Sequence, residues 1–410
     1  MILQSKLVNL ALLILGFGLG QGSLFAANTF LFWNGNYDLV ANFGAANALV
    51  TFAYFIGDWG GLVYLAKETV VRVQGRRPVE ASYLALSLIR LLVATLFFAG
   101  FIIYQVSQPP SFFAEYSRFA SLGLFAYAFN VNGLLDGTSR AGISGLTQAL
   151  PVVLAAIVLP FCVAVDPIVA GRILGSVYAV GMFMAIAIQL AAVAPNRERA
   201  LQGFSLSTIW AVGRESLSYM LAPLPGHALF RVQVMLATTF LSPLLTALFL
   251  YVRQFVGIGY QWLGFFLRVD LKDFSAYLVQ KKPTFIAVLR ESMVIRHGAA
   301  GTLGLCGLAL VLLPWRPDLA WGLLIYSPCI LASSIATTLQ RVFLLQSRGT
   351  ENVIILTSVA VMSCLVMFPF VDTLAIWPLV GIELLSQVLQ SGIFAGRWRL
   401  GIPESGGGDK

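Results

Sequence analysis

Charged residues are scarce in this sequence: Asp, Glu, Lys and Arg make up 11% of its 410 residues. A soluble domain usually carries about 25% charged residues, so this chain lacks the polar surface that a water-soluble protein of its length needs. In contrast, 58% of the residues are hydrophobic, and the mean hydropathy is +0.84. The composition therefore excludes a soluble enzyme and predicts one continuous membrane body.

Cysteine and histidine are also scarce, with four cysteines and two histidines. The cysteines stand singly in apolar stretches without a C-x-x-C spacing, so the sequence predicts neither a disulfide framework nor a metal site. A P-loop, a zinc motif, a serine-triad motif and a nucleotide-binding glycine pattern are all missing. We therefore expect no bound cofactor, no catalytic residues and no transport driven by ATP bound to this chain.

The net charge of +8 could point to a nucleic-acid partner. However, the basic residues are spread over short loops between apolar runs, and no separate basic domain is present. Membrane topology and anionic lipid headgroups explain such loops. We therefore expect membrane lipids as partners, and no nucleic acid.

What the sequence does contain is a series of long apolar runs. A helix needs about 20 apolar residues to cross a bilayer core, and the first run continues beyond the short core of a secretory signal. On that scale there are twelve candidate spans: 7–33, 39–66, 82–106, 112–135, 141–165, 168–194, 207–238, 241–268, 293–313, 319–346, 352–371 and 373–396. The sequence predicts an all-α integral membrane protein with about twelve transmembrane helices.

The loops between these spans differ in the number of basic residues that they contain. The loops that follow even-numbered spans hold most of the Lys and Arg, and the alternate loops hold few. Cytosolic loops carry such an excess, so both termini are expected in the cytosol.

The twelve spans divide into two sets of six at the hydrophilic segment 195–206. We expect an N-terminal six-helix lobe over 1–200, a C-terminal six-helix lobe over 201–400 and a cytosolic tail over 401–410. Because six spans separate equivalent helices, the lobes would share one orientation. A parallel pseudo-twofold repeat about an axis normal to the membrane would then relate them.

Helix-weakening residues fall in the first helix of each predicted lobe. They are Gly20 and Gly22 in the first lobe, and Pro223, Pro225 and Gly226 in the second. Interrupted helices at corresponding positions point to the moving, substrate-lining elements of a transporter, although Gly and Pro also serve close packing in membranes. We interpret the five residues as hinges.

The first two spans carry a series of short motifs. They are Gly20-Gln21-Gly22-Ser23, Asn42-Phe43-Gly44, Asp58-Trp59-Gly60-Gly61 and Ala66-Lys67-Glu68. This series resembles the opening of Wzx-type polysaccharide and O-antigen flippases, which belong to the multidrug/oligosaccharidyl-lipid/polysaccharide (MOP) exporter superfamily. The motifs cover about the first 80 residues, and the rest of the chain matches in helix count, length and loop pattern.

The resemblance implies a function in polysaccharide biosynthesis. Such flippases move undecaprenyl-pyrophosphate-linked oligosaccharide from the cytosolic to the outer leaflet of a bacterial inner membrane. The resemblance also implies two lobes around a central cavity with alternating access. Its expected partners are the polyprenyl-pyrophosphate-linked glycan, a glycan polymerase and a chain-length regulator.

Three arginines fall at membrane depth: Arg90, Arg231 and Arg253. An ionisable group there costs several kcal/mol, so each is a candidate functional residue. Guanidinium binds phosphate oxygens through a planar fork, and we therefore predict that these arginines contact the anionic part of the substrate.

Internal ion pairs are the alternative. Asp58 and Arg90 lie at equal depth on adjacent predicted helices, and Glu383 could pair with Arg253. Asp58, Glu383 and His227 are also the candidates for coupling transport to H⁺ or Na⁺, whereas a histidine beside a Pro-Gly break can instead bind a freed backbone carbonyl.

Two other functions stay open. A multidrug/cation antiporter of the same superfamily would favour acidic lumen residues over arginines. A membrane glycan polymerase or ligase would need a large outer loop with polar catalytic groups, and every predicted outer loop is short.

Overall fold

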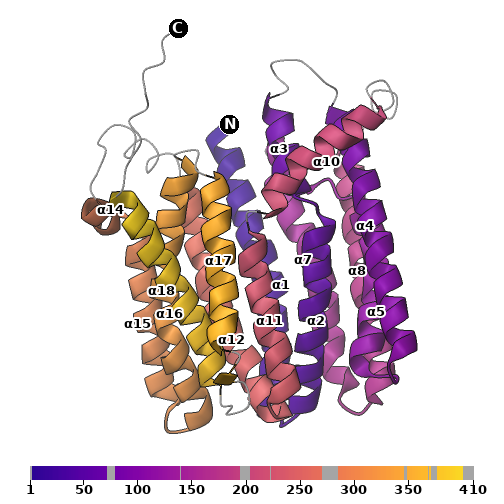
Figure 1. The fold of residues 1–410 in the computed structure, drawn as a ribbon. Helices are drawn as coiled ribbons and strands as arrows, with labels where there is room; N and C mark the ends of the chain where they lie inside the picture. The colour runs from indigo at the N-terminus through magenta and orange to yellow at the C-terminus, as the bar shows by residue number, and fades with distance from the viewer. Residues whose placement is uncertain are drawn as a thin grey trace. The chain divides into compact units, whose positions relative to one another are not determined.

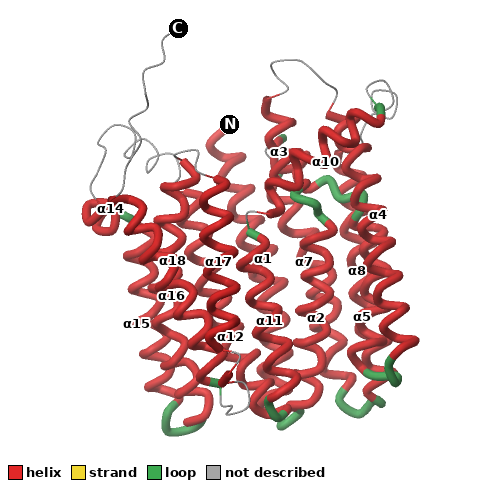
Figure 2. The backbone as a smooth tube through the Cα atoms, viewed as in Figure 1, coloured by secondary structure: helices red, strands yellow, loops and turns green. Residues whose placement is uncertain are grey.

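The computed structural model describes residues 2–71, 79–138, 140–193, 204–221, 223–269, 285–345, 349–367, 369–370 and 376–399. The regular structure in these ranges is helical (Figure 2). The chain forms two compact units, unit 1 over Met1–Val234 and unit 2 over Met235–Lys410. The predicted tail over 401–410 and most of the basic residues that set the orientation lie outside the described residues.

Unit 1 contains the helices α1 Ile2–Trp33, α2 Tyr37–Gly57, α3 Gly61–Val71, α4 Val79–Ser107, α5 Phe112–Tyr127, α6 Asn132–Gly137, α7 Ala141–Val158, η2 Leu159–Cys162, α8 Pro167–Val193 and α10 Leu206–Leu221, and α11 Leu224–Phe240 begins in it. Within this unit α1 packs on α7, and α5 packs on both α4 and α8 (Figure 1).

Unit 2 contains the helices α12 Pro243–Val269, α14 Phe285–Glu291, α15 Met293–Leu312, α16 Pro317–Leu345, α17 Gly349–Met367 and α18 Trp377–Arg399. Here α16 is central, because it packs against α12, α15, α17 and α18.

Nine helices among the described residues are long and apolar enough to cross a membrane. This result confirms an all-helical membrane protein, whereas the count of twelve, the repeat and the orientation of the termini stay predictions. Of the other three predicted spans, 112–135 is divided into α5 and α6, and 207–238 into α10 and α11. The third, 352–371, corresponds to the shorter apolar helix Glu351–Val366.

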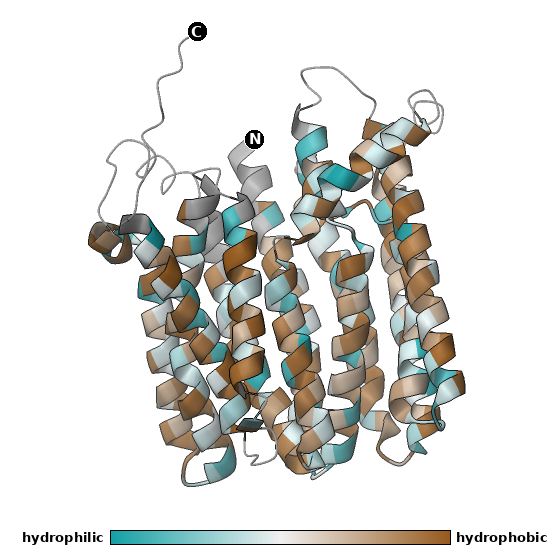
Figure 3. Ribbon diagram, in the orientation of Figure 1, coloured by the Kyte–Doolittle hydropathy of each residue, from teal (hydrophilic) through white to brown (hydrophobic). Residues whose placement is uncertain are grey.

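The outer faces of the helices are hydrophobic, as a lipid environment requires. On α4, for example, Leu92, Leu96 and Ile103 expose 62%, 64% and 69% of their surface. Figure 3 shows hydrophobic residues along most of each helix, whereas α3 and α10 are more hydrophilic. An apolar face of this kind would be a liability in water and is the normal surface of a protein in a bilayer.

The predicted hinge glycines lie in a helix that stays continuous. A Cβ at Gly16 would lie 2.5 Å from the carbonyl oxygen of Gly145, and one at Gly20 would lie 3.3 Å from the Cβ of Ala149. Small residues thus let α1 approach α7 closely. Nothing lies within 4 Å of a Cβ at Gly22, so packing does not explain that glycine.

Candidate functional site

Helix α2 ends at Gly57 and α3 begins at Gly61, and the break between them has unusual backbone geometry. Trp59 has φ +52° and Gly60 has φ +71°. Glycine adopts the left-handed region freely, whereas a tryptophan there stores about 1–3 kcal/mol of strain. The surroundings must therefore hold this break in place.

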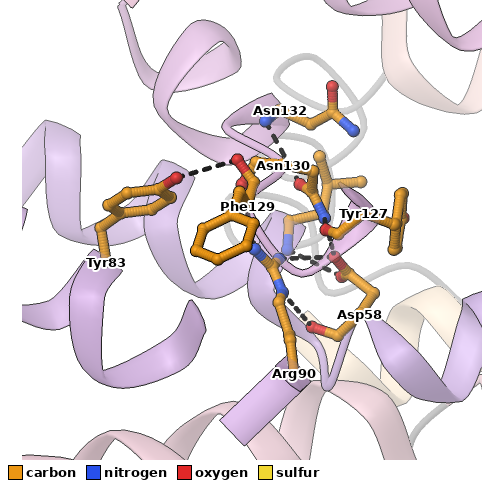
Figure 4. A network of polar contacts seen from close by, with 8 residues as sticks. Asp58, Tyr83, Arg90, Tyr127, Phe129, Asn130 and Asn132 are labelled. Atoms are coloured by element: carbon orange, nitrogen blue, oxygen red, sulfur yellow. Dashed lines mark hydrogen bonds and ion pairs between the residues drawn. The ribbon is translucent and has the colours of Figure 1, made fainter. Parts of the chain in front are cut away.

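Arg90 from α4 supplies much of that support (Figure 4). Its Nε donates to the backbone oxygen of Asp58 at 3.1 Å, and its Nη1 donates to the backbone oxygen of Asn130 at 3.0 Å. Asn130 lies in a second break, between α5 and α6. One guanidinium thus connects the break between α2 and α3 to the break between α5 and α6.

The same guanidinium pairs with the Asp58 carboxylate. Arg90 Nη2 lies 2.6 Å from Asp58 Oδ1, and the arginine side chain is 0% exposed. Asp58 Oδ1 also accepts from Asn130 Nδ2 at 3.3 Å, while its Oδ2 accepts from the backbone NH of Leu62 at 2.9 Å. All three nitrogens of Arg90 therefore donate within unit 1, an arrangement that favours the structural ion pair over substrate contact.

Helix α10 docks on the break between α2 and α3. The indole nitrogen of Trp59 donates to the backbone oxygen of Gly213 at 3.1 Å. A Cβ at Gly60 would lie 2.2 Å from the backbone oxygen of Ser216. Further along, Lys67 pairs with Glu215 at 2.9 Å. Gly60 is thus needed both for its positive φ and for the close approach of α10.

The third break separates α10 from α11, at the predicted Pro223–Gly226 position. Of its helix-weakening residues, Pro223 lies between the two helices, whereas Pro225 and Gly226 lie in the first turn of α11, and their action as a hinge stays a prediction. Beyond the break, His227 stacks on Phe55 with ring centroids 4.1 Å apart. One turn further, Arg231 Nη2 donates to the Thr51 hydroxyl at 2.8 Å.

Unit 2 has a network of its own around Glu383 on α18. The carboxylate pairs with Arg253 of α12, and it accepts from the Tyr260 hydroxyl at 2.6 Å and the Tyr326 hydroxyl at 2.8 Å. Arg253 Nη1 also donates to the Tyr326 oxygen at 2.8 Å. The side chains of Arg253 and Glu383 are 16% and 5% exposed, so the ion pair is largely buried.

Both ion pairs that the sequence offered as alternatives are thus present, Asp58 with Arg90 and Glu383 with Arg253. Two participants were not predicted, Tyr260 and Tyr326. Tyr260 lies seven residues after Arg253, on the same helix face, and this spacing could have identified it. Tyr326 comes from a different helix, and no local pattern marks it. No group of His, Cys, Asp and Glu in the described ranges could hold a metal ion.

No family model and no curated protein matches the chain. Solved structures do. The chain is similar to the inward-facing conformation of a multidrug resistance MATE family transporter of the MOP superfamily, with a TM-score of 0.72, 17% identity, and 96% of this chain and 97% of that one covered.

Two further structures are similar over 97% of this chain. One is MATE in complex with Br-NRF, with a TM-score of 0.59, 15% identity and 97% of that chain covered. The other is an outward-facing conformation of a multidrug resistance MATE family transporter, with a TM-score of 0.52, 16% identity and 93% of that chain covered. The chain therefore has the fold of the MATE transporters of the MOP superfamily.

Proposed function

We propose that this protein is a transporter that moves undecaprenyl-pyrophosphate-linked oligosaccharide from the cytosolic to the outer leaflet of a bacterial inner membrane. Two observations support transport by alternating access. The fold is that of MATE transporters, and the similar structures include inward-facing and outward-facing conformations. The opening motifs add the resemblance to flippases.

The observation that carries the choice of substrate is the position of Arg231. It lies near the middle of α11 (Leu224–Phe240), where insertion of an arginine into a bilayer costs about 2.5–3.5 kcal/mol. Its guanidinium donates to the Thr51 hydroxyl and lies 4.6 Å from the centre of the Phe230 ring. Arginine binds phosphate oxygens through charge-assisted, bidentate hydrogen bonds, which are stronger than a bond to a neutral hydroxyl.

A multidrug/cation antiporter is the second candidate, because the similar solved structures are multidrug MATE transporters. Such a protein needs carboxylates that can meet a cationic drug. Here Asp58 is paired with Arg90, and Glu383 is paired with Arg253. Each carboxylate thus already has an internal cation, and the balance of charge favours an anionic substrate.

The test is the leaflet distribution of lipid-linked oligosaccharide in cells depleted of this protein. We expect accumulation on the cytosolic leaflet, restored to normal by the wild-type chain but not by Arg231→Ala. Arg290→Ala is the matched control, because the Arg290 side chain is 80% exposed and its loss removes the same charge. It should restore the distribution fully.

Unchanged lipid-linked oligosaccharide after depletion would overturn the flippase proposal. Drug accumulation in the same cells would then test the antiporter. Full restoration by Arg231→Ala, with normal flipping by the wild type, would retain the flippase but remove Arg231 from the substrate site.

A further inference from the structure

Two glycines of α8 fit this helix closely against α5. A Cβ at Gly171 would lie 2.5 Å from the backbone oxygen of Phe112, and one at Gly175 would lie 2.6 Å from the backbone oxygen of Tyr116. Small residues allow two membrane helices to approach in this way. The two contacts advance together along both helices, so α5 and α8 run in the same direction and their N-terminal ends lie side by side.

Two arginines lie beside one aromatic ring at this contact. The guanidinium carbon of Arg118, on α5, lies 5.3 Å from the centre of the Phe119 ring, and that of Arg172, on α8, lies 5.8 Å from it. Arg118 comes six residues after the start of α5, and Arg172 comes five after the start of α8. At 1.5 Å per residue, both lie about 7–9 Å from the starts of their helices. The two cations therefore share one ring and a similar depth.

The acidic groups at this end of unit 1 balance one of the two cations. Oε2 of the buried Glu115 lies 3.4 Å from Arg172 Nε, and Oε1 accepts from Gln105 Nε2 at 2.8 Å. The Asp166 carboxylate, just before α8, accepts from backbone NH groups of that helix. Within the described part of the chain, the Arg118 guanidinium has a cation–π contact but no hydrogen bond or ion pair. One positive charge is thus left in excess.

The surface around the two arginines is hydrophobic and exposed. Leu122 follows Arg118 by one helical turn on the same face of α5, and its side chain is exposed. Val169 and Ile173, beside Arg172 on α8, are exposed as well. Helix faces of this kind lie against lipid, and the long side chain of arginine can extend from such a face to the headgroup layer.

We propose that Arg118, Arg172 and Phe119 form a binding site for the headgroup phosphate of an anionic phospholipid. A guanidinium binds phosphate oxygens through charge-assisted hydrogen bonds, and a cation–π contact holds it in place without using its hydrogen-bond donors. The excess of one positive charge matches the single negative charge of a phosphodiester. The exposed hydrophobic side chains beside the arginines provide the contact surface for the acyl chains.

The orientation predicted from the basic loops places this site in the outer leaflet, because the loops before α5 and α8 follow odd-numbered spans. The inference does not depend on the proposed function. The lipid is bound at a lipid-facing surface and is not the transported substrate, so the site would serve a flippase and an antiporter equally.

The experiment measures binding of phosphatidylglycerol to the full-length protein in detergent by native mass spectrometry. The wild type should bind one phosphatidylglycerol more tightly than further copies and more tightly than phosphatidylcholine. Arg118→Gln and Arg172→Gln should each weaken this first binding about fivefold, which corresponds to the roughly 1 kcal/mol that one basic residue contributes near anionic headgroups. The double variant should lose the preference for phosphatidylglycerol over phosphatidylcholine.

Three controls separate this site from general attraction of the basic protein to anions. Arg316→Gln removes the same charge, but Arg316 is paired with Asp318 at 3.1 Å, so this variant should bind phosphatidylglycerol as the wild type does. Inorganic phosphate should not displace the lipid, because it has no acyl chains. Melting of each variant in phosphatidylcholine micelles shows that it is folded.

The inference is overturned if the wild type does not prefer phosphatidylglycerol, or if folded Arg118→Gln binds it as tightly as the wild type. Equal weakening by Arg316→Gln would also overturn it, because the attraction would then belong to the whole basic surface. Displacement by inorganic phosphate would indicate a site for a soluble anion instead. Arg172 is largely exposed, so Arg172→Gln tests the site again if Arg118→Gln does not fold.

Discussion

At the scale of single residues, the shape of the guanidinium explains why position 90 is arginine. Its nitrogens reach three acceptors in different directions, the Asp58 oxygen, the Asp58 carboxylate and the Asn130 oxygen. An ammonium group is a compact point charge and does not reproduce this planar fork. Gly61 belongs to the same arrangement, because a Cβ there would lie 2.0 Å from Arg90 Nη2.

We therefore expect Arg90→Lys to destabilise the protein although it conserves the charge. Bonds to charged groups contribute about 1.5–3 kcal/mol each, so the loss of at least one such bond should lower the melting temperature in detergent. Arg90→Ala should cost more, about 3–5 kcal/mol, because Asp58 then loses its buried partner. Arg172→Lys is the control, since the Arg172 side chain is 53% exposed. Equal melting temperatures for Arg90→Lys and the wild type would contradict this structural role.

At the scale of helices, the breaks at Asp58 and Asn130 occur where Arg90 binds the backbone oxygens of these two residues, and not simply where glycine is frequent. Helix α1 stays continuous through Gly18, Gly20 and Gly22, whereas α2 ends at Gly57, just before Asp58, whose backbone oxygen accepts from Arg90. A glycine inside a helix raises its flexibility without interrupting it. A hinge in α1 would therefore bend the helix only while the protein changes conformation.

The glycine hinge can be separated from packing by two substitutions in α1. Nothing lies within 4 Å of a Cβ at Gly18 or at Gly22, so alanine fits at both and should stabilise the helix by up to about 1 kcal/mol each. If Gly22 is a hinge, Gly22→Ala should raise the melting temperature and lower the rate of transport. Gly18→Ala, the matched control, should raise the melting temperature alone. Equal transport by both variants would remove Gly22 from the hinge.

At the scale of the whole molecule, the sequence predicted helices better than it predicted where they break. Apolar runs indicate a membrane helix because the bilayer is the partner of every such run. The break at Pro223 has a local signal, since proline removes a backbone donor. The breaks at Trp59 and Asn130 have no local sequence signal as clear as that proline. The residue that stabilises both breaks is Arg90, which is far away in the sequence. Tyr326 of the Glu383 network was missed for the same reason, whereas the spacing of Tyr260 from Arg253 could have identified that tyrosine.

The orientation in the membrane is the remaining whole-molecule prediction. Basic residues concentrate in alternate loops, and the energetics of insertion place such loops in the cytosol. Asn34, in the turn between α1 and α2, should then lie outside, and Arg290, at the end of α14, should lie inside. A membrane-impermeant maleimide should label Asn34→Cys in intact cells and Arg290→Cys only after lysis.

The wild-type chain, which keeps its four cysteines, gives the background labelling for both variants. Labelling of Arg290→Cys in intact cells, with Asn34→Cys protected until lysis, would invert the topology. The basic loops would then face outward, where the anionic surface of the cytoplasmic leaflet could not hold them. A flippase loading its substrate from the cytosol would also have to load it at the opposite ends of the helices. The labelling therefore decides which ends of the helices face the cytosol, where the substrate is loaded.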